Sequence, residues 1–350
     1  MKLRKKEVTT KETSEALYEH YIALDWSEKT MAIARMRSQA VTPKVIEERS
    51  DVKKLKKYLR ELKGRKILTI EETTSTHWLY VELKESVDKI LVCDPYRNKL
   101  LSEGAKTDKI DSIKLCKLLR GGFLKEVYHS DDESYKIRKI VSAYEDLVKA
   151  GVRVQNQKSA IYRGVGLKYK KDSISEEDKL MHYVEETQNR SIQLYREEKK
   201  KYEVLFNDLR KNNETIKKQI EISGIGNIFA VTIYSTVIDA RRFETKYKYW
   251  SYCGLTYNEK ESGGKSYGKK RPRHSRKLRW VYKSAAMAAI GGNNDIRKYY
   301  EYLLGEGLGE KKAQNAIARY IAKVSYGVMK TGKSYRPYQW RETKEEVKQN

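Results

Sequence analysis

Four carboxylates in the first third of the chain have the types and positions that metal chemistry needs. Asp25 ends the apolar run YIALD, and Glu72 ends ILTIEE, so each follows a strand-like segment. Asp108 and Asp111 in KTDKID lie three residues apart, which places them on one face of a helix. Carboxylates that come together repel one another unless a cation lies between them. The four residues therefore predict a site for Mg²⁺ or Mn²⁺, hard cations that bind oxygen ligands and phosphates.

Each of these acids also has an ordinary explanation when it is taken singly. Asp25 could cap a helix or lie in a solvated loop. Glu71 and Glu72 are adjacent, so at most one of them points into any given site. Asp108 and Asp111 could be first-turn residues that the helix dipole favours. The metal-site hypothesis therefore rests on the combination of the acids and on their strand-end positions.

A second group of reactive residues lies in ESGGKSYGKKRPRHSRKLRW, residues 261–280. A serine hydroxyl such as that of Ser262 can attack phosphorus if a base or a metal lowers its pKa. Glycines let a backbone approach a phosphate closely, and a basic run attracts a phosphodiester. The positions expected to contact nucleic acid here are Gly263, Gly264, Lys265, Lys269, Lys270, Arg271, Arg273, Arg276 and Arg279. The alternative is a polar hairpin loop with a turn serine, which the local sequence alone favours.

The segment ISGIGNIFAVTIYSTV contains a Gly-Ile-Gly turn between two helical stretches. Such a turn resembles a helix-hairpin-helix, and the backbone N–H groups around Gly224 and Gly226 could bind a phosphate. A tight turn between helices needs the same glycines without any ligand. Both interpretations stay open from the sequence.

The composition indicates a polyanionic partner. Among 350 residues, 74 Lys and Arg face 48 Asp and Glu, which gives a net charge of +26. Phosphate neutralisation by Lys and Arg drives non-specific nucleic-acid affinity. Cys93, Cys116 and Cys253 are odd in number and lack metal-ligand spacing, so we expect core residues in a reducing cytoplasm. No apolar run approaches the ~18 residues of a membrane span, and the charged N-terminus lacks the apolar stretch of a secretion signal.

Hydrophobic patterning divides the chain into three structured parts between two polar ends. The fold class expected is α/β plus α. Within the first part, the patterning predicts a helix over residues 44–63 that ends at Gly64, and strands at YIALDW, EKTMAIARM, RKILTIEE and DKILVCDP. The parts are a flexible lead-in over 1–19, an α/β domain over 20–130, a helical region over 131–220, a mainly helical domain over 221–335 and a polar tail over 336–350.

The helical region predicts two long helices. The first covers SYKIRKIVSAYEDLVKAGVRVQNQKSAIY and has a possible interruption near Gly151. The second runs from Ser175 to Ile220 and carries a seven-residue repeat, formed by Met181, Gln188, Tyr195, Tyr202, Leu209 and Ile216. This repeat predicts either a helical hairpin or coiled coil that serves dimerisation, or a helix packed on its own domain.

On these motifs the chain resembles the DEDD-type insertion-sequence transposases of the IS-one-ten and IS-eleven-eleven group, which are bridge-RNA-guided recombinases. The family's N-terminal motifs are a strand that ends in Asp, then Glu-Ala-Thr-Gly-x-Tyr-Trp, then Lys-Thr-Asp-x-x-Asp. Here they are YIALDWS, EETTSTHW and AKTDKIDS, and the C-terminal motifs are GIGNIFA, YCGLT, SGG and KLR. Alignment on Thr74 and Trp78 selects Glu72 rather than Glu71. The resemblance covers about residues 20–330.

Two departures from the family pattern affect the site. Ser75 stands where the family has a glycine, so the turn after the glutamate is expected to differ in shape. The stretch before KLR contains Pro272 and no glycine, so Ser266 and Ser275 remain alternatives to Ser262 as nucleophile.

The resemblance implies a fold, a mechanism and partners. The N-terminal domain would be a RuvC-like (RNase H-like) sheet that binds Mg²⁺ or Mn²⁺ through Asp25, Glu72, Asp108 and Asp111. Ser262 would cleave DNA through a covalent phosphoserine, and exchange and religation would follow without net hydrolysis. The domains would meet across protomers of a dimer or tetramer in a prokaryotic cytoplasm. A structured guide RNA would specify the element ends and the target DNA by base pairing.

Two rival functions remain open. The first is a metal-dependent, structure-specific DNA nuclease, such as a Holliday-junction resolvase, in which the acids hydrolyse DNA and Ser262 has no chemical role. The second is a non-catalytic nucleic-acid-binding protein built on the basic stretch and the Gly-Ile-Gly turn. Ser262→Ala is expected to abolish strand breakage only in the recombinase, whereas Asp108→Asn or Asp111→Asn is expected to abolish it in both enzymes.

Overall fold

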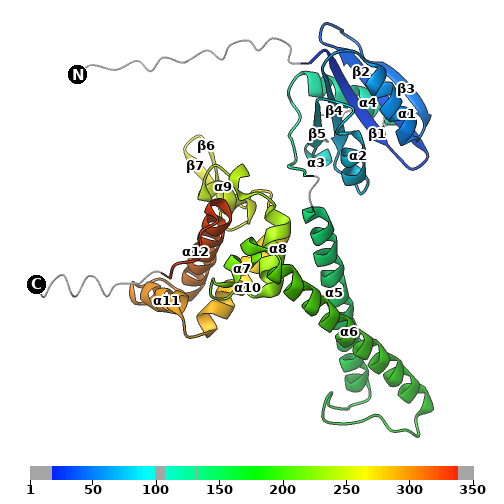
Figure 1. Cartoon of the computed structure of the whole chain (residues 1–350). Coiled ribbons are helices and arrows are strands. Elements are labelled where there is room, and N and C mark those ends of the chain that lie inside the picture. Colours follow the sequence, from blue (N-terminus) through cyan, green and yellow to red (C-terminus); the bar gives the residue numbers. More distant parts are fainter. Residues whose placement is uncertain (1–17, 99–106, 131–132, 338–350) are drawn as a thin grey trace, which may run out of the picture. The chain divides into compact units, whose positions relative to one another are not determined.

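The computed structural model describes residues 18–98, 107–130 and 133–337 (Figure 1). These residues form two compact units, one that ends at Asp132 and one that begins at Glu133. The predicted lead-in and polar tail lie almost wholly outside the described residues.

The first unit contains a mixed five-stranded sheet of order β3-β2-β1-β4-β5. The β1–β2 and β2–β3 pairs are antiparallel, whereas the β1–β4 and β4–β5 pairs are parallel. This arrangement is consistent with the RuvC-like sheet that the resemblance implies. The strands are β1 His20–Trp26, β2 Thr30–Arg37, β3 Lys44–Arg49, β4 Lys66–Glu71 and β5 Lys89–Cys93.

Helices cover both faces of the sheet (Figure 1). α1 (Val52–Glu61) and α2 (Thr76–Leu83) pack their buried leucines against Ile22, Leu24, Leu68 and Ile70. α4 (Asp108–Arg120) packs against the opposite face, where it contacts Ala23, Ala34 and Ile67. The short helix α3 (Pro95–Asn98) follows β5. Alternate residues of each strand therefore face different helices, so the position of an acid along a strand determines which face its side chain lies on.

The predicted helix over 44–63 is wrong in its first part. Residues Lys44–Arg49 form β3, which pairs with β2 through Val45 opposite Ala34 and Ile46 opposite Ile33. The two β-branched residues suit this pleated pairing better than a helix. Asp51 then begins α1, because its Oδ1 accepts hydrogen bonds from the N–H groups of Lys53 and Lys54 at 2.8 and 3.1 Å. The Asp51 cap was the sequence signal for the true helix start.

The second unit opens with two long helices that lie side by side, α5 (Ser134–Gly164) and α6 (Lys179–Lys211). α5 continues through Gly151 without interruption. The glycine has a packing role there, because the absence of a side chain leaves room for the ring of Tyr195 on α6. A Cβ at position 151 would lie 2.4 Å from that ring. Farther along, Tyr144 contacts Tyr202 and Phe206 at ring distances of 5.7 and 5.2 Å. Part of the seven-residue repeat thus packs within one chain, and its use in dimerisation stays a prediction.

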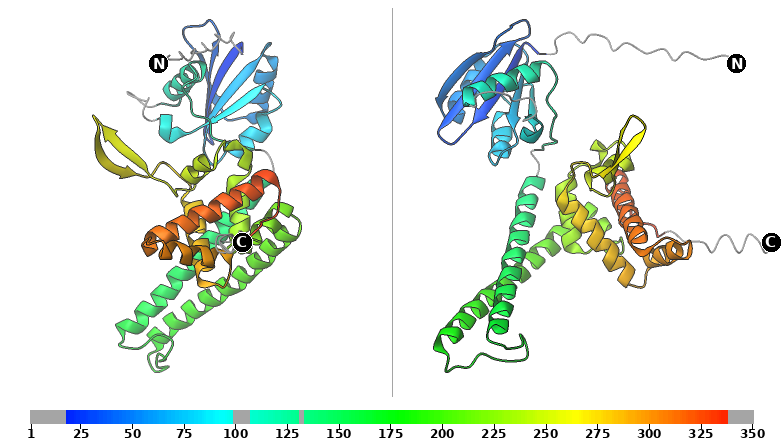
Figure 2. Two further views of the ribbon diagram at one scale, coloured as in Figure 1. Left: turned by 90° about the vertical axis from the view of Figure 1, so that its left-hand side faces the viewer. Right: turned by 180° about the vertical axis from the view of Figure 1, so that it is seen from behind.

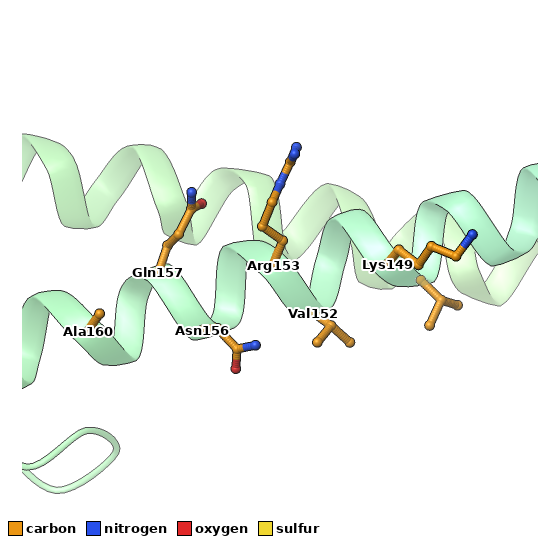
Figure 3. Close-up of a pocket in the computed structure, with 7 residues that line it drawn as sticks. Lys149, Val152, Arg153, Asn156, Gln157 and Ala160 are labelled. Carbon is orange, nitrogen blue, oxygen red and sulfur yellow. The ribbon is translucent and has the colours of Figure 1, made fainter.

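The outer surface of α5 carries a shallow hollow whose lining comes from this single helix (Figure 3). Val152, Asn156 and Ala160 lie along it, and Val152 is 46 % exposed. A hollow with one wall offers no convergent polar groups, so we assign no site to it.

The rest of the second unit is a helical body. Its core includes a buried chain of hydrogen bonds. The hydroxyl groups of Tyr249 and Tyr282 are hydrogen-bonded to each other, and the Tyr282 hydroxyl lies 2.8 Å from the Ser325 hydroxyl. The Ser325 hydroxyl donates to the side-chain oxygen of Gln219 at 2.7 Å. The elements are α7 Glu214–Ile220, α8 Asn227–Val237, a 3₁₀ turn Ala240–Arg242, α9 Lys246–Tyr252, β6 Asn258–Ser262, β7 Lys265–Lys270, α10 Arg276–Gly291, α11 Asp295–Gly305 and α12 Glu310–Thr331.

Two expectations about composition can be compared with the structure. Cys93, Cys116 and Cys253 are all buried in hydrophobic clusters, which confirms them as core residues. Burial raises the pKa of the Cys116 thiol to about 12. Among the described helices, none is both long and apolar enough to cross a membrane.

Candidate active site

Two of the acids meet at the carboxyl end of the parallel strands. β1 and β4 pair in register as far as Leu24 opposite Ile70, so Asp25 and Glu71 are the next residues on neighbouring strands. Asp25 alternates with Ala23, and Glu71 alternates with Ile67 through Thr69, so both point to the face that α4 covers. Adjacent strands lie about 4.8 Å apart. Strand geometry therefore brings the half-buried Asp25 and Glu71 together.

The N-terminus of α4 lies at this same edge. Cys116 on α4 donates its thiol to the carbonyl oxygen of Tyr21 at 3.3 Å, and Arg120 reaches the carbonyl of Ala40, beyond the other end of the sheet. The helix therefore runs antiparallel to β1. From Cys116 back to Asp108 it rises about 12 Å, and from Tyr21 forward to Asp25 the strand advances about 13 Å. Asp108 thus lies level with Asp25.

Local hydrogen bonds fix where α4 begins. The Thr107 hydroxyl accepts from the N–H of Ile110 at 3.2 Å, and the Thr107 carbonyl accepts from the N–H of Asp111 at 2.9 Å. Asp108 and Asp111 therefore lie in the first turn, where the helix dipole stabilises negative charge. The dipole explanation and the metal-ligand explanation apply to the same two residues, so this position alone does not choose between them.

Glu72 lies differently from Glu71. It follows the last residue of β4, its side chain is exposed, and its N–H donates to the carbonyl of Cys93 at 2.9 Å. By strand alternation its side chain belongs to the opposite face from Asp25. Motif alignment selects Glu72, whereas strand geometry groups Glu71 with Asp25, and a matched pair of substitutions can separate the two.

A fifth acid at this edge was not considered from the sequence. Asp94 follows β5 directly and is 7 % exposed. Its Oδ1 accepts from the N–H of Tyr96 at 3.0 Å, which caps the short helix α3. The Asp-Pro sequence after an apolar strand could have signalled this cap. A structural role thus accounts for Asp94.

The donor set at this edge suits a hard divalent cation, because every candidate ligand is a carboxylate. Within residues 18–98, 107–130 and 133–337, however, no three His, Cys, Asp or Glu side chains stand close enough together to hold a metal ion. The structure thus places Asp25, Glu71, Asp108 and Asp111 at one edge without closing them into a coordination sphere.

Ser262 lies in the second unit, at the tip of the β6–β7 hairpin that projects from the helices (Figure 2). Ser262 pairs with Lys265, and Gly263 and Gly264 between them have φ values of +56° and +75°. Two consecutive positive φ angles define a tight turn that glycine makes without strain. Every residue of β6 and β7 is exposed. The predicted polar hairpin is therefore present, and Ser262 is exposed beside its turn.

The two alternative serines have different settings. Ser266 is exposed on β7, opposite Glu261. Ser275 caps α10, since its hydroxyl accepts from the N–H of Leu278 at 3.2 Å. A capping hydroxyl already has a structural role, so Ser275 is the weakest of the three candidates.

The basic residues of this segment divide by burial. Lys265, Lys269, Lys270, Arg273 and Arg276 are exposed, and Lys269 pairs with Glu259 at 2.8 Å. Arg271 and Arg279 are half-buried near the start of α10. The exposed residues can follow a nucleic-acid backbone. The half-buried Arg271 and Arg279 are less accessible to such a backbone.

The Gly-Ile-Gly turn joins α7 to α8 and has a packing reason for one of its glycines. Gly224 has a φ of +88°, and a Cβ there would lie 2.2 Å from the carbonyl oxygen of Ala285 on α10. Gly226 precedes α8 with nothing within 4 Å of its position for a Cβ. The close approach of two backbones therefore requires Gly224 independently of any phosphate contact.

Replacing Gly224 with alanine is expected to lower the free energy of unfolding by about 2–4 kcal/mol, because strain at a positive φ adds to the backbone clash. Gly226→Ala is the matched control, with an expected cost below about 1 kcal/mol. Denaturant unfolding of both variants measures the difference. Equal stabilities would contradict the packing explanation.

Two family models match the chain on these same segments. A model described as a transposase, of the DEDD type of IS110, matches residues 22–165. A second, described as Transposase IS116/IS110/IS902 family, matches residues 220–301, which contain the Gly-Ile-Gly turn and the Ser262 hairpin. A search of curated proteins gave no match.

The two matches identify the chain as a transposase, an enzyme of DNA strand transfer. More closely, the chain carries a DEDD transposase domain of the IS110 type and a transposase domain of the IS116/IS110/IS902 family. This confirms the IS-one-ten part of the resemblance. DEDD transposase domains typically depend on divalent metal, which agrees with the all-carboxylate donor set.

Proposed function

We propose that this transposase is an RNA-guided serine recombinase that cleaves, exchanges and rejoins DNA strands through Ser262. One observation carries the proposal most directly. Ser262 stands at the exposed tip of a hairpin with basic residues on both sides of its turn and after it, inside the segment that matches the IS116/IS110/IS902 transposase model. A nucleophile that must reach a phosphodiester in duplex DNA needs such exposure.

The covalent step is a transesterification. The Ser262 Oγ attacks a backbone phosphorus and gives up its proton to a base, while the bond from phosphorus to one sugar oxygen breaks. That oxygen leaves as a strand-end hydroxyl after it takes up a proton. A hydroxyl of another strand then attacks the phosphoserine, and Ser262 leaves as the alcohol. The number of phosphodiester bonds is conserved, so religation needs no separate energy source.

The carboxylates at the edge of the first unit would hold the Mg²⁺ or Mn²⁺. We propose Asp25, Asp108 and Asp111 as ligands, together with one glutamate of the Glu71–Glu72 pair. A bound cation would supply charge stabilisation at the phosphate and help to activate the attacking hydroxyl. The acids and Ser262 lie in different units, so the proposal includes their meeting across protomers of a dimer or tetramer that α5 and α6 assemble.

RNA guidance belongs to the proposal as well. A structured RNA from the flank of the element would pair with the element ends and with the target DNA. The net charge of +26 favours binding of both polyanions. Binding measured with and without the flanking RNA tests this part separately from the chemistry.

A second candidate is a metal-dependent, structure-specific nuclease. The acidic edge on a RuvC-like sheet favours it, because such acids can hydrolyse DNA through a metal-activated water with no serine step. The two candidates leave different products. A recombinase holds one strand end on the protein, whereas a nuclease releases both ends.

The deciding experiment traps the intermediate. Purified protein, Mg²⁺, co-expressed flanking RNA and labelled element-end DNA are combined, denatured and separated on a gel. We expect a labelled protein–DNA band that depends on Mg²⁺. Free cleaved DNA without any protein adduct would instead support the nuclease and leave Ser262 as a turn residue.

A further inference from the structure

Three cations lie within electrostatic range of one another where the chain passes from β7 to α10. Arg271 follows β7 directly, and Arg279 and Lys283 lie one turn apart on α10, so they share a face of the helix. All three are half-buried. The Arg271 guanidinium stacks on the ring of Tyr257 at 4.2 Å and donates to its hydroxyl, which holds the guanidinium in place. We call these three residues the hairpin-base cluster.

No acid neutralises the hairpin-base cluster among the residues that the structure describes. Neither Arg279 nor Lys283 forms an ion pair there, and the buried Nε atoms of Arg271 and Arg279 have no hydrogen-bond acceptor. Two neighbouring lysines differ from this cluster, since Lys277 contacts Glu145 at 3.0 Å and Lys269 contacts Glu259 at 2.8 Å. Half-burial without an acidic partner therefore distinguishes Arg279 and Lys283 from these two lysines.

Such an arrangement is costly in the free protein. Buried donors without acceptors lose their hydration, and like charges close together repel. Burial lowers the pKa of the Lys283 amino group, and the charges of Arg279 and Arg271 lower it further. An anion that fits between the three side chains would relieve both costs, because it accepts hydrogen bonds and carries the opposite charge.

We propose that the hairpin-base cluster is a phosphate-binding site that takes one backbone phosphodiester of a nucleic-acid strand lying along the hairpin. Arg271 and Arg279 provide planar donor groups that suit phosphate oxygens, and Lys283 adds a point charge. The inference rests on the proposed function, since it requires nucleic acid as the substrate. It does not depend on whether Ser262 or water breaks the strand. Lys283 lies outside the basic stretch, so nothing in the motifs indicates it.

The first test compares Lys283→Met with Lys298→Met, which removes the same charge from an exposed position on α11. Fluorescence anisotropy measures the affinity of each variant for duplex element-end DNA and, separately, for the flanking RNA. We expect Lys283→Met to weaken binding about tenfold and to reduce the salt slope by about one, and Lys298→Met to do much less. A loss with DNA alone assigns the phosphate to DNA, and a loss with RNA alone assigns it to RNA.

The second test separates binding from folding. Lys283→Met should raise the unfolding temperature of the free protein, because it removes a desolvated charge from a repelling group. Inorganic phosphate should raise the unfolding temperature of the wild type and of Lys298→Met more than that of Lys283→Met. Arg279→Met is a second variant with the same expected loss of nucleic-acid binding.

The outcomes distinguish the inference from the function on which it rests. If the wild type binds neither DNA nor RNA, the proposed function fails. If the wild type binds both and Lys283→Met matches Lys298→Met in affinity and salt slope, the hairpin-base cluster is not a phosphate site. A Lys283→Met protein that is less stable than the wild type would show that Lys283 has a structural role and would also overturn the inference.

Discussion

The Ser262→Ala variant is expected to form no covalent protein–DNA product and to exchange no strands. The Oγ is the atom that becomes bonded to phosphorus, so its removal eliminates the first chemical step rather than slowing it. Ser262 is exposed at the end of β6 and contributes no core packing, so the variant should fold and bind DNA like the wild type. The measurement is the denaturing gel described above, together with DNA affinity for the same preparation.

Two control variants test whether the assignment is specific to position 262. Ser266→Ala, four residues farther on at the start of β7, should retain the adduct. Ser275→Ala should also retain it but lose about 1 kcal/mol of stability, because it removes the cap of α10. An adduct that survives Ser262→Ala and disappears in Ser266→Ala would keep the reaction and move the nucleophile. Wild-type adduct levels in all three variants would contradict a serine nucleophile in this hairpin.

The sequence could predict most of the first unit because its strands are apolar runs with clear ends. The strands at YIALDW and RKILTIEE were predicted, and Asp108 and Asp111 were expected on one face of a helix, which α4 provides. That the acids form one metal site stays a prediction. The β3 strand was missed because Val45 and Ile46 stand among charged residues that also suit a helix. Pairing with β2 decides that strand, and a pairing partner is not visible in local spacing.

The sequence could not resolve positions that depend on contacts between distant segments. Gly224 could be a phosphate contact or a packing position, and only the carbonyl of Ala285, 61 residues away, supplies the packing reason. From the sequence, Lys283 resembles any lysine on an amphipathic helix. Only the structure shows that Arg271, which follows β7, lies close enough to act on its charge. Ser262 lies within a recognised motif, yet its exposure at a turn depends on the pairing of β6 with β7, in which Ser262 lies opposite Lys265.

The adjacent glutamates show most directly where sequence and structure differ. Alignment of Thr74 and Trp78 with the family motif assigns Glu72 as the motif glutamate by counting residues. Such counting cannot detect a shift of one position in the turn, where Ser75 replaces the family's glycine. Strand alternation is a physical constraint with a period of two, so it assigns Glu71 and Glu72 to opposite faces. Asp25 and α4 lie on the face of Glu71.

We therefore expect Glu71→Gln to reduce strand cleavage by at least about 100-fold and Glu72→Gln to reduce it by no more than about twofold. Both changes remove one negative charge at neighbouring positions, so each variant controls for the other. Glu71→Gln should also raise the Mg²⁺ concentration needed for half-maximal cleavage, because one fewer carboxylate faces the cation. Cleavage across a Mg²⁺ titration, with unfolding measured in parallel, separates metal binding from stability. A larger loss in Glu72→Gln would show that the chain twists after β4 and that the motif alignment identifies the ligand.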